Sequence, residues 1–297
     1  MSLSTAEINE LMERVHTLEL RAKKLIKEPF AGEYHSSFKG SGLDFDDYRA
    51  YQPGDEIRFI DWNVTARTNT PYTRTFKEER ERKVFLMVDV SGSTLYGSGE
   101  KSKRFLAAEI AATMAFAALH NNDKVGLILY ADKPIKFIPP AKGRSHALRL
   151  IREILHTSAS DGHADMVEIC KFVNRVTEKR SLIFCISDFQ DMSLERALPA
   201  TAYRHDFVAL RVEDPAEARL PKVGKIALRD PETGHQVMVD TKNGTVRMAY
   251  RKLRQRFVVG LADFFKKHGV DYAVFHTDQD FFPTLFHLLK KRSARRS

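Results

Sequence analysis

The sequence predicts an α/β protein in which helices flank a mostly parallel central sheet. Two observations predict this class, the short apolar runs and the helical patterns that lie between them. Short apolar runs, typical of strands buried on both faces, alternate with helical patterns over the second two thirds of the chain. That alternation builds a parallel sheet, because each connecting helix returns the chain to the same end of the sheet. The chain of 297 residues is 43% hydrophobic and can bury a substantial core.

Residues 1–29 predict an amphipathic N-terminal helix. Ser4 and Glu7 form a capping box, and apolar residues follow at alternating spacings of three and four. Pro29 and Gly32 are expected to end the helix. Its apolar side has two interpretations, packing on its own domain or docking on a partner as a coiled-coil arm.

Residues 30–83 predict a strand-and-turn layer held by pairs of arginine and carboxylate side chains. Aromatic residues there alternate with charges of both signs around a Pro-Gly turn. We expect Trp62, the only tryptophan, to pack this layer onto the main domain with its ring buried. The alternative is a partner-binding groove, for which the candidate residues are Arg58, Asp61, Trp62, Arg67 and Arg74.

Residues 84–290 predict the α/β domain. The expected strands are 84–89, 125–130, 135–138, 181–187, 207–212 and 270–276, and the expected helices are 102–121, 145–155, 166–177, 246–267 and 282–290. Two alternating runs around a Pro/Gly turn predict an inserted β-hairpin at about 213–245. Residues 291–297 are expected to form a basic tail.

Two of the central strands end in acidic residues. Asp89 ends the first strand and is followed by Ser91 and Ser93, and Asp188 follows the fourth strand. Open α/β sheets bind ligands at the carboxyl ends of their strands. Gly92 lets the loop turn sharply, which brings together oxygen atoms of the kind that Mg²⁺ prefers. The same residues also fit a buried strand that ends in a polar turn.

The Asp-x-Ser-x-Ser sequence at residues 89–93, the later Ser-Asp pair and the strand order resemble the von Willebrand factor A domain with its metal-ion-dependent adhesion site. The resemblance implies Mg²⁺ held by Asp89, Ser91, Ser93 and Asp188, with a carboxylate of the partner completing its coordination. One position departs from the pattern, because Ala164 stands where a threonine ligand is usual. A methyl group cannot bind a metal, so an occupied Mg²⁺ site and a metal-free scaffold both remain open.

The loop before Met166 offers substitutes for the missing threonine. Ser160, Asp161 or a bridging water are candidates to replace it. His163 is expected to be a solvated loop residue, because imidazole is a poor ligand for Mg²⁺.

Residues 51–67, followed by the sequence at 89–93, are similar to a bacterial family catalogued as domain of unknown function 58, and residues 229–234 are similar to its later segment. The resemblance extends over about residues 38–276. It implies an adaptor or chaperone-type protein that works with a MoxR-type AAA+ ATPase in assembling, activating or metal-loading other protein complexes. The client is not implied.

Charge, motifs and cysteine content limit the other functions that the chain could have. The formal charge of +9 keeps a basic nucleic-acid-binding protein as an alternative, although Lys and Arg are interleaved with Asp and Glu outside the predicted tail. No nucleophile–histidine–acid set or phosphate-binding loop is found, so we expect no enzyme, and a metal-dependent hydrolase is the lesser alternative. Two cysteines and no signal peptide predict a cytoplasmic protein that reaches membranes only through partners.

Overall fold

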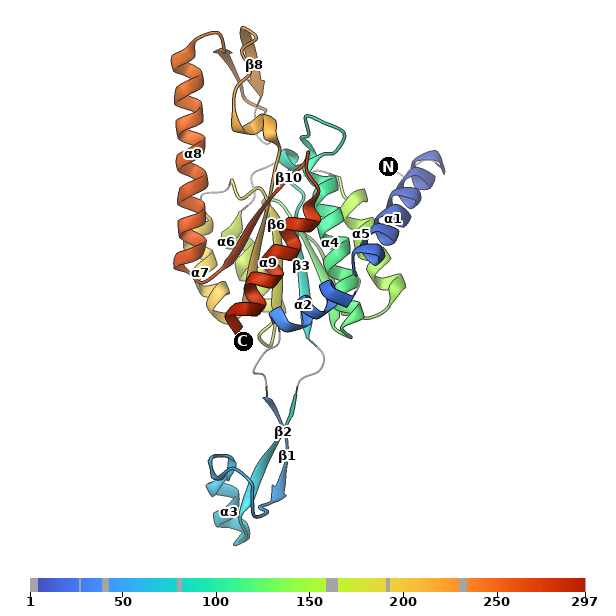
Figure 1. Cartoon of the computed structure of the whole chain (residues 1–297), viewed down its shortest axis with the longest axis vertical. Coiled ribbons are helices and arrows are strands. Elements are labelled where there is room, and N and C mark those ends of the chain that lie inside the picture. The colour runs from blue at the N-terminus through green and yellow to red at the C-terminus, as the bar shows by residue number, and fades with distance from the viewer. Residues whose placement is uncertain are drawn as a thin grey trace. The chain divides into compact units, whose positions relative to one another are not determined.

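The computed structural model describes residues 5–26, 28–38, 43–78, 82–158, 165–190, 193–229 and 234–296. The chain divides into two compact units (Figure 1). The main unit comprises Met1–Phe38 and Lys83–Ser297, and a small unit comprises Lys39–Arg82. The boundary falls after residue 38 rather than residue 29, because residues 28–38 form a helix of the main unit.

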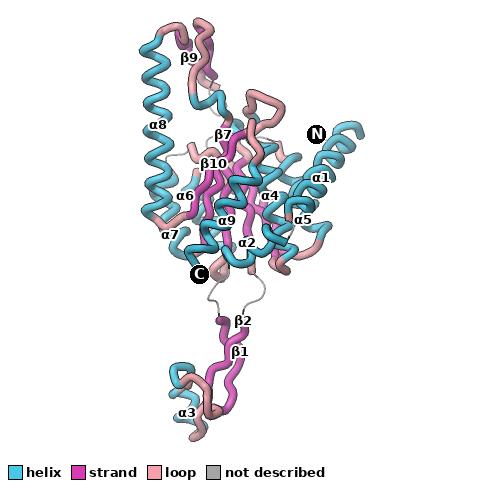
Figure 2. Tube along the Cα trace, viewed as in Figure 1, coloured by secondary structure: helices cyan, strands magenta, loops and turns pink. Residues whose placement is uncertain are grey.

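A six-stranded sheet forms the centre of the main unit (Figure 2). Its strand order is β10-β7-β6-β3-β4-β5, and all neighbours are parallel except β4 and β5. The predicted α/β class with a mostly parallel sheet is confirmed. The strands are β3 (Lys83–Asp89), β4 (Lys124–Tyr130), β5 (Pro134–Ala141), β6 (Leu182–Ser187), β7 (Asp206–Glu213) and β10 (Asp271–His276).

Helices cover both faces of the sheet because consecutive strand residues point to opposite faces. In β3, Val84, Leu86 and Val88 enter one buried cluster, and Phe85 and Met87 enter the other. The first face is covered by α1 (Thr5–Leu25), α2 (Glu28–Phe38), α4 (Lys103–His120), α5 (Arg144–His156) and α9 (Phe281–Arg296). The second is covered by α6 (Met166–Val176), α7 (Leu194–Arg204) and α8 (Gly244–Lys267).

The N-terminal helix packs on its own unit, which supports the first of its two interpretations. Val15, Leu18 and Ala22 are buried in the first core cluster. Glu19 is also buried and pairs with Arg144 of α5. The predicted end of this segment was wrong, because Gly32 lies inside a second helix, α2.

The basic tail predicted at 291–297 was also wrong, since α9 continues to Arg296. Arg292 is 2% exposed and its guanidinium pairs with Asp206 and with Asp271. Its Nε also donates a hydrogen bond of 3.1 Å to the carbonyl of Ser37 in α2. These acids begin β7 and β10 and are half-buried, so Arg292 joins the end of the chain to the sheet, which a basic tail would not do.

His205, directly after α7, is fully buried. Its Nδ1 accepts a hydrogen bond of 3.2 Å from the backbone N–H of Ser181, which leaves the proton on Nε2, 3.0 Å from Oγ1 of Thr177. Burial lowers the pKa of His205 to about 4, and the charges of Arg204 and Arg180 act in the same direction.

The small unit is a β-hairpin with a short helix at its far end. Strands β1 (Leu43–Ala50) and β2 (Tyr72–Glu78) pair antiparallel, with η1 (Ile57–Phe59) and α3 (Trp62–Thr68) between them. Trp62 is 65% exposed, so its predicted burial was wrong. The preceding Asp61 caps α3, which makes Trp62 the first residue of a helix that buries no side chain.

An inserted hairpin of β8 (Lys225–Arg229) and β9 (Gln236–Asp240) follows η3 (Pro215–Ala218). Figure 1 shows this hairpin beside the N-terminal half of α8, beyond the end of the central sheet. Of the 24 residues of α8 only Leu261 and Phe265 are buried, and both lie in its last third. We call residues 219–267 the arm.

Candidate functional site

The predicted acidic loop lies at the carboxyl end of β3. Asp89 is 2% exposed, and its Oδ1 accepts a hydrogen bond of 2.8 Å from the backbone N–H of Ser91. Its Oδ2 accepts one of 2.7 Å from the hydroxyl of Ser187 at the end of β6. The hydroxyl oxygens of Ser91 and Ser93 lie 3.1 Å apart. The structure therefore brings these residues together at the edge where both strands end.

Asp188 follows Ser187 and places a second buried carboxyl group beside Asp89. The pKa of Asp89 is raised to about 6, chiefly by burial and in addition by the negative charge of Asp188. Hydrogen bonds from Ser187 and Ser91 oppose these two effects. A carboxyl group in this state is stabilised in its charged form by any additional cation that binds next to it.

Lys103, the first residue of α4, is a member of the site that the sequence analysis missed. Its side chain is fully buried, and its Nζ lies 2.9 Å from Oδ2 of Asp188 and 2.7 Å from Oε1 of Glu217. Burial alone would lower the pKa of Lys103, but the charges of Asp188 and Glu217 outweigh it and raise the pKa. Lys103 is thus a cation built into this edge of the sheet.

Arg104 stabilises the Asp89 loop, by which we mean residues 89–94. Its guanidinium donates to the carbonyl of Val90 at 2.8 Å, to Oγ1 of Thr94 at 2.9 Å and to the carbonyl of Thr157 at 2.8 Å. Thr94 in turn donates a hydrogen bond of 2.7 Å to the carbonyl of Ser91. These bonds fix the backbone of the loop that carries the two serines.

The side-chain oxygen atoms of this site meet only part of the coordination that Mg²⁺ requires. Adjacent ligands of an octahedral Mg²⁺ at about 2.1 Å lie about 3 Å apart, which matches the distance between the serine hydroxyls. Asp89 is a third oxygen donor, but Asp188 is already paired with Lys103. In the part of the chain that the structure describes, no three His, Cys, Asp or Glu side chains cluster as a metal site. Asp89, Ser91 and Ser93 are therefore the residues that would hold Mg²⁺, with water completing the shell.

The departure at Ala164 falls in a segment that the structure does not cover. Residues 159–164, which include Ser160, Asp161 and His163, lie outside the described residues. The described chain resumes at Asp165, whose side chain caps α6 through the N–H groups of Val167 and Glu168. Asp165 is therefore engaged in holding the start of a helix.

The same polar cluster connects the site to the root of the arm. Asp214, which follows β7, accepts hydrogen bonds of 2.8 and 2.6 Å from the N–H and hydroxyl of Ser98, and one of 2.7 Å from Thr277 after β10. Glu217 of η3, which holds Lys103, also lies 3.7 Å from Arg254 of α8. The arm is thus attached beside the Asp89 loop.

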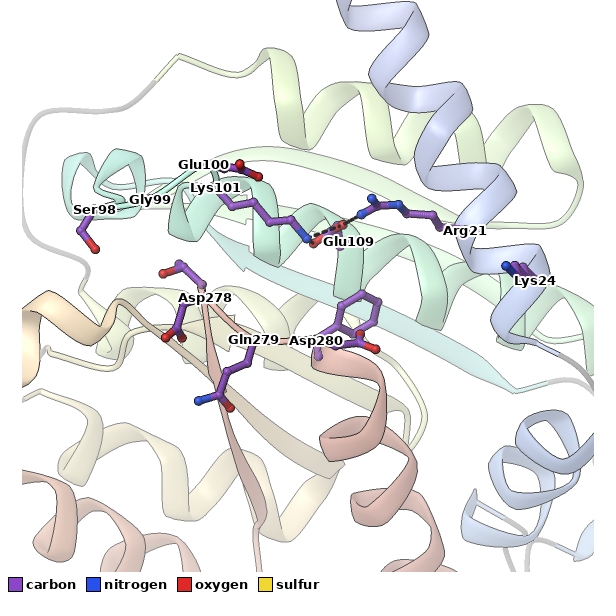
Figure 3. A pocket seen from close by; sticks show the side chains of 12 residues that line it. Arg21, Lys24, Ser98, Gly99, Glu100, Lys101, Glu109, Asp278, Gln279 and Asp280 are labelled. Atoms are coloured by element: carbon purple, nitrogen blue, oxygen red, sulfur yellow. Dashed lines mark hydrogen bonds and ion pairs between the residues drawn. The ribbon is translucent and has the colours of Figure 1, made fainter.

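A pocket of about 680 Å³ opens at this edge of the main unit, between α1, α4 and the β10–α9 loop (Figure 3). Inside it, the buried Glu109 pairs with Arg21 at 2.6 Å and with Lys101 at 2.8 Å. Asp278 and Asp280 line the other side. Its charges are of both signs, and the ion pair of Arg21 with Glu109 attaches α1 to α4.

Among the partner-binding candidates in the small unit, Asp61 and Arg74 also pair with each other inside the unit. Asp61 is 5% exposed and accepts hydrogen bonds from two N–H groups of α3 and one of 2.8 Å from Nε of Arg74. Arg58, Trp62 and Arg67 are exposed. Contact of the five candidates with a partner stays a prediction.

The strand order and the acidic serine loop after the first strand of the sheet define a von Willebrand factor A-like protein. Residues 47–257 match the family described as protein of unknown function DUF58, and the chain belongs to that family. The uncharacterized protein Rv1480 of Mycobacterium tuberculosis is 32% identical over 228 residues, which cover 76% of this chain and 72% of that protein. The uncharacterized protein YeaD of Bacillus subtilis is 27% identical over 131 residues, 43% of this chain and 29% of that protein.

Two solved structures are similar over the main part of the chain. The conserved hypothetical protein BatB from Bacteroides thetaiotaomicron is 18% identical, with 72% of this chain and 99% of that chain covered and a TM-score of 0.46. The SpRpn10 VWA domain is 11% identical, with 72% and 94% covered and a TM-score of 0.39. In the described part of this chain, no helix combines the length and apolar character needed to cross a bilayer.

Proposed function

We propose that this chain is a non-catalytic adaptor that works with a MoxR-type AAA+ ATPase in the assembly or activation of protein complexes. Its partner binds at the edge of the sheet where β3 and β6 end. The observation that carries the proposal is the Asp89 loop, in which the two serine hydroxyls lie 3.1 Å apart and Ser91 is hydrogen-bonded to a buried carboxyl group. Membership of the family, which we expect to act beside such ATPases, supports the choice of partner.

Mg²⁺, when bound there, would supply a positive charge that attracts a carboxylate of the partner. The residues of this chain supply the rest. Ser187 orients Asp89, Arg104 fixes the loop, and Lys103 neutralises Asp188, so that the charge of Asp89 is the one left for a cation. Affinity for the metal is expected to be weak, because Asp188 is engaged elsewhere.

The exposed end of the small unit is proposed as a second contact surface. Trp62 and Ile57 are 65% and 68% exposed there, and Arg58 and Arg67 are exposed nearby. Tryptophan and arginine dominate the binding energy of many protein interfaces. This surface would bind without a metal, so it is separable from the Asp89 loop.

The test measures binding of the MoxR-type ATPase of the same genome by calorimetry, in Mg²⁺ and in EDTA. Asp89→Asn keeps the side chain's size and removes its charge, and we expect it to weaken binding about tenfold or more and to abolish the effect of Mg²⁺. Asp132→Asn, after the neighbouring strand β4 and at the same edge, is the control and should bind as the wild type does.

Two outcomes would count against the proposal in different ways. Binding that is unchanged in EDTA and in Asp89→Asn would reject the loop as the contact, and Trp62→Ala would then show whether the small unit carries it. No binding of the ATPase under any condition would reject the partner itself.

A further inference from the structure

The positive charge of the chain is concentrated in the arm. Residues 219–267 contain twelve Lys and Arg and four Asp and Glu, a net charge of +8 out of +9 for the whole chain. Most of these bases are exposed, including Lys225 and Arg229 of β8 and Lys252 and Arg256 of α8. The sequence analysis had placed part of the surplus in a tail at 291–297, where Arg292 is in fact paired and buried.

The hairpin of the arm also presents an apolar face. In the antiparallel register, Ile226 lies opposite Val239, and Leu228 lies opposite Val237, so all four point to the same side. Leu228 and Val237, which are nearer the turn, are 37% and 52% exposed. Lys225 and Arg229 alternate with these aliphatic side chains along β8 and point to the other side.

Among the described residues, this face is only partly covered, at Ile226 and Val239. Strands β8 and β9 form a sheet of two strands only and pack chiefly on each other. A two-stranded hairpin is marginally stable in water by itself, and a third strand or a covering segment stabilises it. Both outer edges of the hairpin are also unpaired within the described sheet, which permits an extended segment to add to it.

We propose that the arm is a docking surface for an acidic protein segment with aliphatic side chains, which covers the Ile226–Leu228–Val237–Val239 face while its carboxylates pair with the surrounding Lys and Arg. The proposal rests on the proposed function only in that the chain binds proteins, and it needs neither Mg²⁺ nor Asp89. Residues 225–240 themselves carry two bases and three acids, so it is the ten Lys and Arg in the rest of the arm whose charge complementarity selects an acidic partner. The apolar face selects a partner that carries aliphatic groups.

The same observations weigh against other anionic partners. Residues 225–240 contain no Phe, Tyr or Trp, which single-stranded nucleic acids use for base stacking. They also lack the aromatic anchors that are enriched where proteins enter a membrane interface. Phosphates alone would pair with the bases of the arm and leave the aliphatic face uncovered.

The test uses labelled peptides and fluorescence anisotropy on the full chain. One peptide repeats Glu-Glu-Leu, and the other, of equal length and charge, repeats Glu-Glu-Ser. We expect the leucine peptide to bind at least tenfold more tightly. Leu228→Ser with Val237→Ser should remove that preference, and Lys225→Glu with Arg229→Glu should weaken both peptides. These four residues are exposed, and circular dichroism checks that the variants are folded.

Lys266→Glu with Lys267→Glu is the matched control, because it makes the same charge change at the exposed end of α8 farthest from the hairpin. It should keep the preference for leucine, and so should Asp89→Asn, which separates this proposal from that for the loop. Equal binding of the two peptides, or unchanged binding by the hairpin variants, would overturn the proposal. So would tighter binding of duplex DNA, single-stranded DNA or phosphatidylglycerol vesicles that is lost in the Leu228/Val237 variant.

Discussion

Replacing Lys103 by Met tests the central feature of the site, a buried cation that holds two carboxylates. Methionine keeps most of the apolar stem and removes the ammonium group. Asp188 and Glu217, whose side chains are 5% and 18% exposed, would lose hydrogen-bonded ion pairs of 2.9 and 2.7 Å. Removing one partner of a buried ion pair costs about 3–5 kcal/mol, a large part of the 5–15 kcal/mol that a typical protein has.

The assay is urea unfolding of the full chain, followed by far-ultraviolet circular dichroism. Tryptophan fluorescence is unsuitable, because the only tryptophan, Trp62, belongs to the small unit. With a denaturant slope near the upper end of the usual range, about 3 kcal/mol per M, the midpoint should fall by about 1–2 M. Lys101→Met is the control, since Lys101 is partly exposed and its partner Glu109 keeps Arg21. It should cost less than about 1 kcal/mol.

Two further measurements show whether the loss is electrostatic. Adding Asp188→Asn to Lys103→Met should recover much of the lost stability, because the buried negative charge is removed as well. Millimolar Mg²⁺ should raise the midpoint of Lys103→Met more than that of the wild type, since a metal could then reach Asp188. A variant as stable as the wild type, or one as stable as Lys101→Met, would refute the role assigned to Lys103.

Other parts of the fold give predictions with equally direct readouts. His205 has a pKa of about 4 in the folded chain and 6.5 in the unfolded chain, so the unfolded chain binds more protons between these two pH values. The free energy of unfolding should therefore fall by up to about 3 kcal/mol as pH drops from 6.5 to 4. In urea titrations, His205→Asn should lack this loss. The hydrogen bond from Arg144 lowers the pKa of Glu19 from its ordinary value of 4.5 to about 2. The ionised carboxylate therefore stabilises the fold above pH 4.5, and this stabilisation is lost as pH falls toward 2. Glu19→Gln should make stability depend less on pH in this acid range. Arg292→Met should lower stability by about 3 kcal/mol in thermal unfolding, because two carboxylates lose their partner. In the small unit, Asp61→Ala should speed amide hydrogen exchange of residues 43–78 by losing about 2 kcal/mol of capping and pairing, whereas Trp62→Ala should change it by less than about 0.5 kcal/mol.

The fold was predictable because its signals are local. Up to its last residue, the strand at 84–89 carries apolar side chains on both of its sides, and the same is true of the strand at 182–187. A sheet that is buried on both faces follows from this pattern. The meeting of Asp89 with Ser187 also follows, because neighbouring parallel strands end at the same edge. Helix α7 was missed, and Pro199 within it is the kind of residue that argues against a helix.

The roles of single charged residues were not predictable, because they depend on what lies opposite in space. Lys103 reads as a solvated residue at the start of a helix, and its two acids come from loops 85 and 114 residues further on. Arg292 reads as part of a tail for the same reason. Trp62 was expected inside because aromatic residues bury large areas, but the cap formed by Asp61 places it on the outside of a short helix.

The contact between α2 and α9 has a consequence for the order in which the protein can fold during synthesis. The ring of Phe30 packs against the rings of Phe282 and Phe286. The hydroxyl of Ser37 donates a hydrogen bond of 2.5 Å to the carbonyl of Leu289. The part of α2 that packs on α9 therefore stays uncovered until about 250 further residues have been synthesised, although Phe38 can pack on Phe184 earlier. This part of the nascent chain is thus open to chaperones, or to aggregation, for almost the whole of its translation, and a stop codon before α9 would leave it permanently exposed.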